Sequence, residues 1–180
     1  MNVMKFKYSA GMVLALSLII ASNVRAQTAQ DIGSKVPDAQ AIKEGLFPED
    51  QCKELEANGF KCMGVKASIR YSLPAAAFLV GSAEVPALLK KQLDVFADVI
   101  KSKKGSGRVV RIEGHADASG TTEVNQALSQ KRAEAVKAYL MEKGVDAPML
   151  KAMGVGAKDP KNPADPFSGE NRRVEIGRQE

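Results

Sequence analysis

The chain has 180 residues, of which 44% are hydrophobic and 26% charged, as in a single globular domain and unlike collagen, a coiled coil or a disordered chain. Two cysteines and one histidine are too few for a cluster of Cys and His metal ligands. The net charge of +5 falls to about +2 once the first 26 residues, with three basic and no acidic side chains, are set aside. The charge therefore gives no support to nucleic-acid binding.

Residues 1–26 are expected to form a secretory signal peptide. Lys5 and Lys7 make a basic start, residues 11–21 an apolar run, and Val24-Arg25-Ala26 a cleavage site that ends in a small residue. The alternative, a retained membrane anchor, needs an apolar run of roughly 20 residues, and this one is shorter. We expect an exported, soluble mature chain without a transmembrane segment, and the cleavage site has no cysteine for a lipid anchor.

The stretch after the leader is polar and has no periodic pattern up to Pro48. Residues 27–48 are therefore expected to be flexible or loosely attached. Residues 49–66 suggest a short helix and a turn, and in an exported protein Cys52 and Cys62, ten positions apart, are expected to form a structural disulfide. The sequence thus predicts an N-terminal segment over 27–66 and a main domain over 67–180.

The main domain shows alternating strand and helix patterns. Val110 and Ile112 share one face of a strand over 108–115, and Leu89, Leu93 and Phe96 recur on one face of a helix. In chain order we expect a strand within 68–80 interrupted by Pro74, a helix from Pro86 to Lys101, the strand over 108–115, a helix over 122–143, a strand over 150–155, a loop over 157–169 and a strand over 173–176. This order predicts an α+β fold, β-α-β-α-β-β, with two helices on one face of a mixed sheet.

A charge falls where the helix over 122–143 should be apolar. Arg132 lies inside a stripe that we expect to face the sheet, and it has Asn125 and Ser129 on the same side; the apolar members are Val124, Leu128, Ala135, Val136 and Tyr139. A guanidinium directed at the sheet needs an anion or a wet cleft. Asp117 is the nearest acid along the chain. Either these residues ring a polar pocket beside the helix N-terminus, or Asp117 and Arg132 form a structural ion pair.

Such a pocket suits a particular ligand chemistry. A guanidinium binds a carboxylate through two parallel hydrogen bonds, N–H groups at the helix start favour the same anion, and Asp117 accepts from an ammonium. The match is an ammonium and a carboxylate on one carbon, as at the free end of an amino acid. Glu113, His115 and Asp117 share a strand face, but alternate positions are poor geometry for one metal ion. We therefore expect no metal, no cofactor and no enzymatic activity.

An ordered set of motifs runs from Ile112 to Ile176: G-H-x-D-x-x-G, then N-x-x-L-S-x-x-R-A, then N-R-R-V-E-I. The motifs resemble the OmpA-like C-terminal domain, the peptidoglycan-binding module of outer-membrane proteins, the peptidoglycan-associated lipoprotein and flagellar-motor stator proteins. The resemblance covers residues 76–177. It implies the fold given above and a noncatalytic role in binding the diaminopimelate of the peptide stem.

The resemblance also implies roles for particular residues. Asp117 falls on the family's aspartate and Arg132 on its carboxylate-binding arginine. Around these two we expect pocket-shaping and supporting residues, namely Asn125, Leu128, Thr121, Ser129, Arg172 and Arg173. One position departs: Gly81 stands where the family commonly has aspartate, so ligand recognition is expected to be weaker or altered.

Two functions follow as expectations. The first is noncovalent anchoring of the protein, or of an envelope complex, to peptidoglycan in the periplasm of a Gram-negative bacterium, near the inner leaflet of the outer membrane. The alternative is a periplasmic scaffold with weakened wall binding, whose residues 27–66 contact an envelope partner. A third interpretation, a wall hydrolase, lacks any catalytic motif in the sequence.

Overall fold

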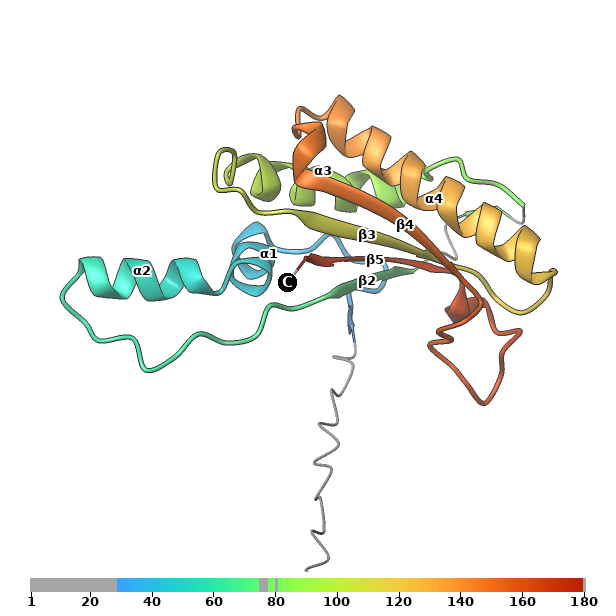
Figure 1. Ribbon diagram of the computed structural model, residues 1–180, viewed down its shortest axis with the longest axis horizontal. Coiled ribbons are helices and arrows are strands. Elements are labelled where there is room, and N and C mark those ends of the chain that lie inside the picture. The colour runs from blue at the N-terminus through green and yellow to red at the C-terminus, as the bar shows by residue number, and fades with distance from the viewer. Residues whose placement is uncertain (1–28, 75–77, 80, 180) are drawn as a thin grey trace, which may run out of the picture.

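The computed structural model describes residues 29–74, 78–79 and 81–179, so the expected signal peptide lies outside the described residues. Within them, the strands form one five-stranded mixed sheet in the order β1-β2-β5-β3-β4 (Figure 1). The strand β5 is antiparallel to both β2 and β3, while β1 with β2 and β3 with β4 are parallel. The bounds are β1 Gln30–Asp31, β2 Tyr71–Pro74, β3 Val110–His115, β4 Leu150–Gly156 and β5 Arg173–Arg178.

Helices cover one face of this sheet. The helices α3 (Ala87–Lys101) and α4 (Thr122–Glu142) lie above it in Figure 1, and single turns of 3-10 helix span Ala147–Met149 and Gly169–Asn171. The expected order β-α-β-α-β-β and the placement of both helices on one face are thereby confirmed. None of the described helices is both long and apolar enough to cross a membrane.

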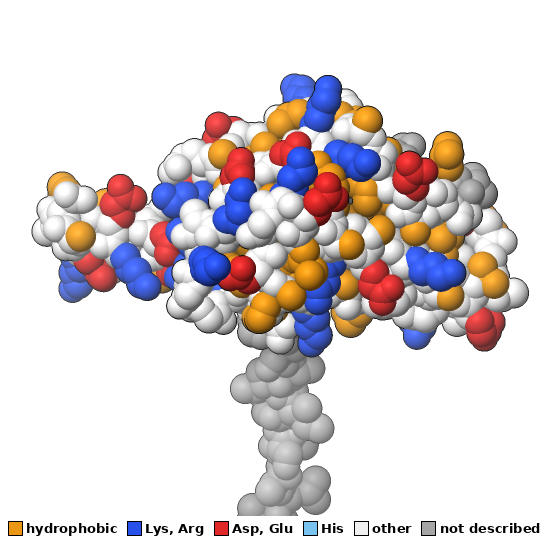
Figure 2. Space-filling view, turned by 90° about the horizontal axis from the view of Figure 1, so that it is seen from above, with side chains coloured by type: hydrophobic (Ala, Val, Ile, Leu, Met, Phe, Trp, Pro, Cys, Tyr) orange, Lys and Arg blue, Asp and Glu red, His pale blue; other side chains and the backbone are white. Residues whose placement is uncertain are grey.

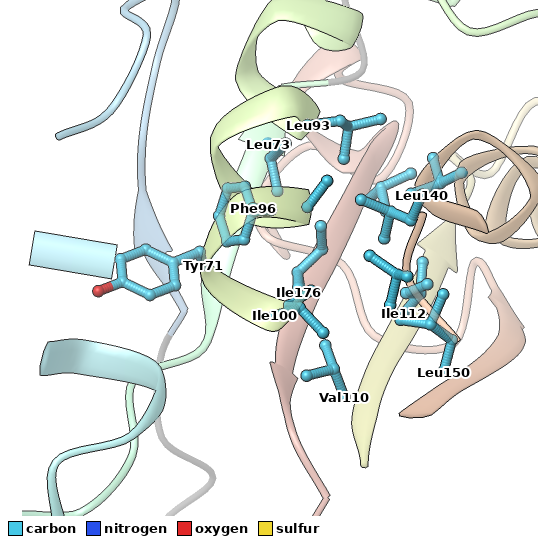
Figure 3. Close-up of a cluster of buried hydrophobic side chains, with 14 of the residues drawn as sticks. Tyr71, Leu73, Leu93, Phe96, Ile100, Val110, Ile112, Leu140, Leu150 and Ile176 are labelled. Carbon is cyan, nitrogen blue, oxygen red and sulfur yellow. The ribbon is translucent and has the colours of Figure 1, made fainter. Parts of the chain in front are cut away.

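The core lies between the sheet and these helices. Alternate residues of the strands point into it, and α3 contributes one apolar face (Figure 3). Completely or almost completely buried members include Leu73, Leu93, Phe96, Ile100, Val110, Ile112, Leu140 and Ile176. The expected inward faces of the strand over 108–115 and of the helix after Pro86 are therefore confirmed.

The N-terminal stretch is part of this core rather than loosely attached. The helix α1 (Ala39–Leu46) packs beside α3 and buries Ile42 and Leu46, and Phe47 follows them into the core. The Tyr71 hydroxyl donates to the Ala41 carbonyl at 3.0 Å, and β1 pairs with β2. The prediction that residues 27–48 are flexible or loosely attached is thus wrong over 30–47. Pro37 does not prevent a helix here, because Asp38 caps the short helix that follows it.

A second helical segment projects from the body as an arm, defined here as residues 49–67. It consists of α2 (Glu49–Ala57) and the chain that returns toward β2, and it extends to one side in Figures 1 and 2. The predicted disulfide between Cys52 and Cys62 is confirmed and clips the arm, with 5.3 Å between the two Cα atoms. No residue of α2 is buried.

Candidate functional site

The site lies where β3 ends and α4 begins. The Thr121 hydroxyl accepts from the Val124 N–H at 3.3 Å and caps α4, and the Asn125 side chain donates to the Gly120 carbonyl at 3.2 Å. Farther along, a Cβ at Gly114 would collide with the Ser129 carbonyl, so α4 rests directly on β3. This close approach fixes the first turns of α4 against the end of the sheet.

Arg132 is the charged residue that the helix turns toward the interior, as its position predicts. Its side chain is completely buried, with an exposed fraction of 1%. The Nε atom donates to the Ser82 carbonyl at 3.0 Å and Nη2 to the Leu79 carbonyl at 3.4 Å, while the Phe78 ring lies 5.1 Å from Cζ. Within the described residues Nη1 has no hydrogen-bond partner.

Asp117 pairs with Arg172 and not with Arg132. Its Oδ2 accepts from Arg172 Nη1 at 2.6 Å, and its Oδ1 accepts from the main chain and hydroxyl of Ser119. Burial would raise the pKa of Asp117, but these bonds from Ser119 and Arg172 outweigh it and hold the pKa below its usual value. The alternative of a structural Asp117–Arg132 ion pair is therefore not what the structure contains.

Both arginines nevertheless belong to one electrostatic cluster with Asp117. Burial lowers the pKa of Arg132 most, and the Arg172 guanidinium lowers it further. The Asp117 carboxylate raises this pKa but does not outweigh them. Arg172 forms an ion pair with this carboxylate, and no ion pair of Arg132 is found among the described residues. This excess of positive charge, with Arg132 Nη1 and Arg172 Nε both unpaired among the described residues, suits an incoming carboxylate.

Some of the remaining expected site residues lie at the pocket, and others hold the strands and helices of the fold together. Asn125 is buried at the turn and Leu128 is half-buried. Ser129 has a structural role. Its hydroxyl donates to the Gln126 carbonyl and accepts from the Gly156 N–H at 2.9 Å, and this second bond joins α4 to β4. Arg173 lies on the helix-free face, where it binds Glu175 at 2.6 Å.

One residue of the expected apolar stripe is misplaced. Val124 has 57% of its surface exposed, because the first turn of α4 overhangs the end of the sheet. The buried face instead runs through Asn125, Ser129, Arg132, Ala133, Val136 and Leu140. The polar half of this face is the part that borders the site.

A small cavity opens beside the first turn of α4. Its volume is about 220 Å³, and its lining is Ala118, Gly120, Thr122, Asn125, Gln126, Gly156, Ala157 and Lys158. Neither Asp117 nor Arg132 lines it. The Arg132 guanidinium binds the carbonyls of Leu79 and Ser82 instead, so the cavity is not its location.

Sequence reasoning missed the partners that come from distant segments. The carbonyls of Leu79 and Ser82 lie about fifty positions before Arg132, and Arg172 lies 55 positions after Asp117. Helical periodicity carries no information on such contacts. The motif N-R-R was the available signal for Arg172, and it indicated a supporting role only.

Glu113, His115 and Glu175 bring their ligand atoms within 4.8 Å of one another on the helix-free face. The carboxylates of Glu113 and Glu175 already form ion pairs with guanidiniums. Arg70 lies 3.3 Å from both Glu113 and Glu175, and Arg173 binds Glu175. A divalent cation would have to displace these cations, so we interpret the cluster as an ion-pair network.

A mixed sheet covered on one face, with an aspartate just before a long helix and a buried arginine in the middle of that helix, defines an α+β domain with a cationic site beside the sheet. The OmpA family model matches residues 77–173, more than half of the chain, and the chain belongs to this family of noncatalytic peptidoglycan-binding proteins. It carries the peptidoglycan-binding domain of that family.

Individual relatives agree with this assignment. The peptidoglycan-associated lipoprotein of Pseudomonas aeruginosa is 41% identical over 88 residues, which cover 48% of this chain and 51% of that protein, and the Legionella pneumophila lipoprotein of the same name is 26% identical over 94% and 93%. The chain thus spans about half the length of the Pseudomonas relative. The OmpA-like domain of FopA1 from Francisella tularensis, at 28% identity, has a TM-score of 0.51 over 59% of this chain and 69% of that one.

Proposed function

We propose that this chain binds peptidoglycan through the diaminopimelate of the peptide stem and thereby anchors itself, or an envelope complex, to the cell wall. The observation that carries the proposal is the buried Arg132 guanidinium, whose Nη1 lacks a partner among the described residues. A buried cation without an anion is costly, and a ligand carboxylate removes that cost. Diaminopimelate ends in an ammonium and a carboxylate on one carbon.

Each group of this head has a matching side chain. Arg132 is assigned the carboxylate, since its Nε and Nη2 bonds to Ser82 and Leu79 orient the guanidinium and leave Nη1 for the ligand. Asp117 is assigned the ammonium. Its Oδ2 already accepts from Arg172, but a carboxylate oxygen has a second lone pair for another donor.

The remaining site residues support these two. Thr121 and Asn125 hold the turn that carries Asp117, and Leu128 offers an apolar wall to the methylene chain of the ligand. Arg172 keeps Asp117 ionised and is itself partly exposed, with 29% of its side chain accessible, so it can also reach the stem. No metal or cofactor enters this scheme.

The proposed location is the periplasm of a Gram-negative bacterium, at the peptidoglycan and on the inner-leaflet side of the outer membrane. Two relatives support it by name: the peptidoglycan-associated lipoprotein and the outer-membrane lipoprotein YfiB, both of Pseudomonas aeruginosa. Cleavage of the leader before Gln27 belongs to the same proposal.

The direct test is co-sedimentation of the mature chain with purified sacculi, in competition with two soluble tripeptides. One tripeptide contains diaminopimelate and the other lysine, which lacks the side-chain carboxylate. We expect only the first to release the protein, and Arg132→Met to weaken binding about tenfold to a hundredfold. Lys131→Met, an exposed neighbour on the same helix, is the matched control and should bind normally.

Two results would contradict the proposal. One is equal competition by both tripeptides, since it would leave the carboxylate without a role. The other is normal sacculus binding by a folded Arg132→Met variant.

A second candidate function, a scaffold with weakened wall binding, is favoured by one observation. Gly81 has a φ of +72°, which an aspartate at this position would adopt only under strain. Residue 81 therefore adds no carboxylate to the site, and a Cβ at this position would contact no described atom within 4 Å. Wild-type protein that stays in the supernatant with intact sacculi would support this function over wall anchoring.

A further inference from the structure

The returning half of the arm, residues 60–67, is an open stretch of chain that the domain does not use. From Lys61 to Ala67 no main-chain N–H donates a hydrogen bond to any described residue, and every one of these residues except the half-buried Cys62 is exposed. The stretch runs alongside α2 and returns to the body in Figure 1. Its main chain is thus available to a partner.

Large apolar side chains gather on the same arm. Met63 has 93% of its surface exposed, Phe60 64%, Val65 55% and Leu55 45%. Scattered exposed apolar residues are normal on a protein surface, but a group of them on one projecting element indicates an interaction site. At the foot of the arm a groove of about 530 Å³ continues this surface past Lys66 to Ile69 and Val36.

The arm is fixed to the body of the protein although no residue of its helix α2 is buried. Its base is fixed by ion pairs of Arg108 with Glu49 at 2.9 Å and with Asp50 at 3.0 Å, and Arg108 lies 5.3 Å from the centre of the Phe47 ring. The disulfide clips the far part. A segment ordered in advance loses less conformational entropy when a partner binds.

The charge of this stretch favours an acidic partner over a second copy of the chain. Residues 58–69 contain Lys61 and Lys66 and no acidic residue. The lysine ion pairs found among the described residues involve neither of them. A second copy that paired antiparallel with this stretch over its whole length would set Lys61 opposite Lys66, and like charges in opposed positions repel. An acidic segment is complementary.

We propose that residues 60–67 are a docking site for an extended segment of another protein, apolar at its centre and acidic at its ends. The apolar centre covers Met63 and Val65, and the acidic ends pair with Lys61 and Lys66. This proposal goes beyond wall binding and does not depend on it, because the arm and the Asp117–Arg132 site share no residue.

The test uses the mature chain and a library of fluorescent nonapeptides with random apolar centres. One half of the library has two glutamates at each end, and the other half has two lysines. We expect selected members of the acidic half to bind, the lysine half to fail, and the double variant K61E/K66E to bind the selected peptides about tenfold more weakly. Hydrogen exchange of residues 61–67 should slow when peptide is bound.

The control is Lys53→Glu, a single substitution of the same kind on the exposed surface of α2 in the same arm, which should bind like wild type. Equal binding of both halves of the library, or equal binding by wild type and K61E/K66E, would overturn the proposal. So would the absence of any acidic binder. A concentration-dependent dimer that K61E/K66E abolishes would assign the stretch to self-association instead.

Discussion

Arg132 is stabilised by contacts that do not neutralise its charge. Two carbonyl oxygens and an aromatic ring contact the guanidinium, but the carboxylate that acts on its charge, that of Asp117, is paired with Arg172. A buried ion without a counterion usually lowers stability relative to an apolar side chain of similar size. The free protein thus retains this residue at the expense of stability, as expected of a binding group.

Removal of the Arg132 charge is expected to raise stability and to weaken ligand binding. In the variant Arg132→Met we expect the free energy of unfolding to rise by about 1 kcal/mol, because the desolvated charge is removed and its stem is kept. Urea denaturation monitored by circular dichroism measures this. A loss of several kcal/mol would instead assign Arg132 a structural role in holding the loop around Leu79 and Ser82.

His115 provides a pH-dependent contribution to stability. Burial and next the Arg173 guanidinium lower its pKa to about 4, against the opposing effects of Glu175 and Asp159. Between this value and the ordinary value near 6.5 the unfolded chain binds a proton that the folded chain does not. We therefore expect stability to fall as the pH drops from about 6.5 to 4, by up to about 3 kcal/mol from this residue.

Denaturation curves between pH 4 and pH 7 check this expectation, with His115→Gln as the comparison. The variant keeps a polar side chain of similar reach but cannot titrate, so its stability should change less over the same range. Parallel pH profiles for the two proteins would show that other groups carry the dependence.

At the scale of elements, the contact between α4 and β3 depends on a glycine. Gly114→Ala places a Cβ against the main-chain carbonyl of Ser129, which cannot move without the helix. We expect a loss of about 1–3 kcal/mol or more in thermal or urea denaturation. Gly177→Ala is the control on β5, since its nearest atoms belong to the flexible Arg70 side chain, and it should cost less.

The arm is expected to loosen independently of the core. In the double variant C52S/C62S, hydrogen exchange should accelerate in α2, whose side chains have no buried anchor, while β3 and β5 stay protected. Mass spectrometry of exchanged peptides separates these elements. Equal acceleration in β3 would mean that the disulfide supports the whole domain.

The elements that could be predicted from the sequence are those with long periodic patterns. In α3, β3 and β5 the apolar residues recur on one face. The buried face of α4 is mixed, with the polar Asn125, Ser129 and Arg132 followed by the apolar Ala133, Val136 and Leu140. The helix α1 has eight residues and anchors through Ile42 and Leu46 alone, which is too short a pattern to separate from a loop. The strand β1 exists only through its pairing with β2.

The candidate site was predictable in part for the same reason. The buried position of Arg132 follows from helical spacing, and Asp117 follows from its place at the end of a strand. The pairing of Asp117 with Arg172 joins residues 55 positions apart, and no local pattern encodes it. Motif resemblance singled out both residues but not their contact.

For the whole molecule, the two proposed sites lie at opposite ends. Figure 1 shows the arm at one end of the long axis and the first turn of α4 at the other. We expect a labelled acidic peptide selected by the arm to sediment with sacculi only when the mature chain is present. K61E/K66E should remove the peptide from the pellet while leaving the protein there, and Arg132→Met should release both.

This separation has a mechanical consequence. A protein that held the wall at one end and a partner at the other would carry tension along its long axis, and β2, β3 and β5 run along that axis in Figure 1. The pull would then slide neighbouring strands past each other and load all the hydrogen bonds of a ladder at once. A sheet pulled across its strands would open bond by bond, so this orientation suits a load-bearing link.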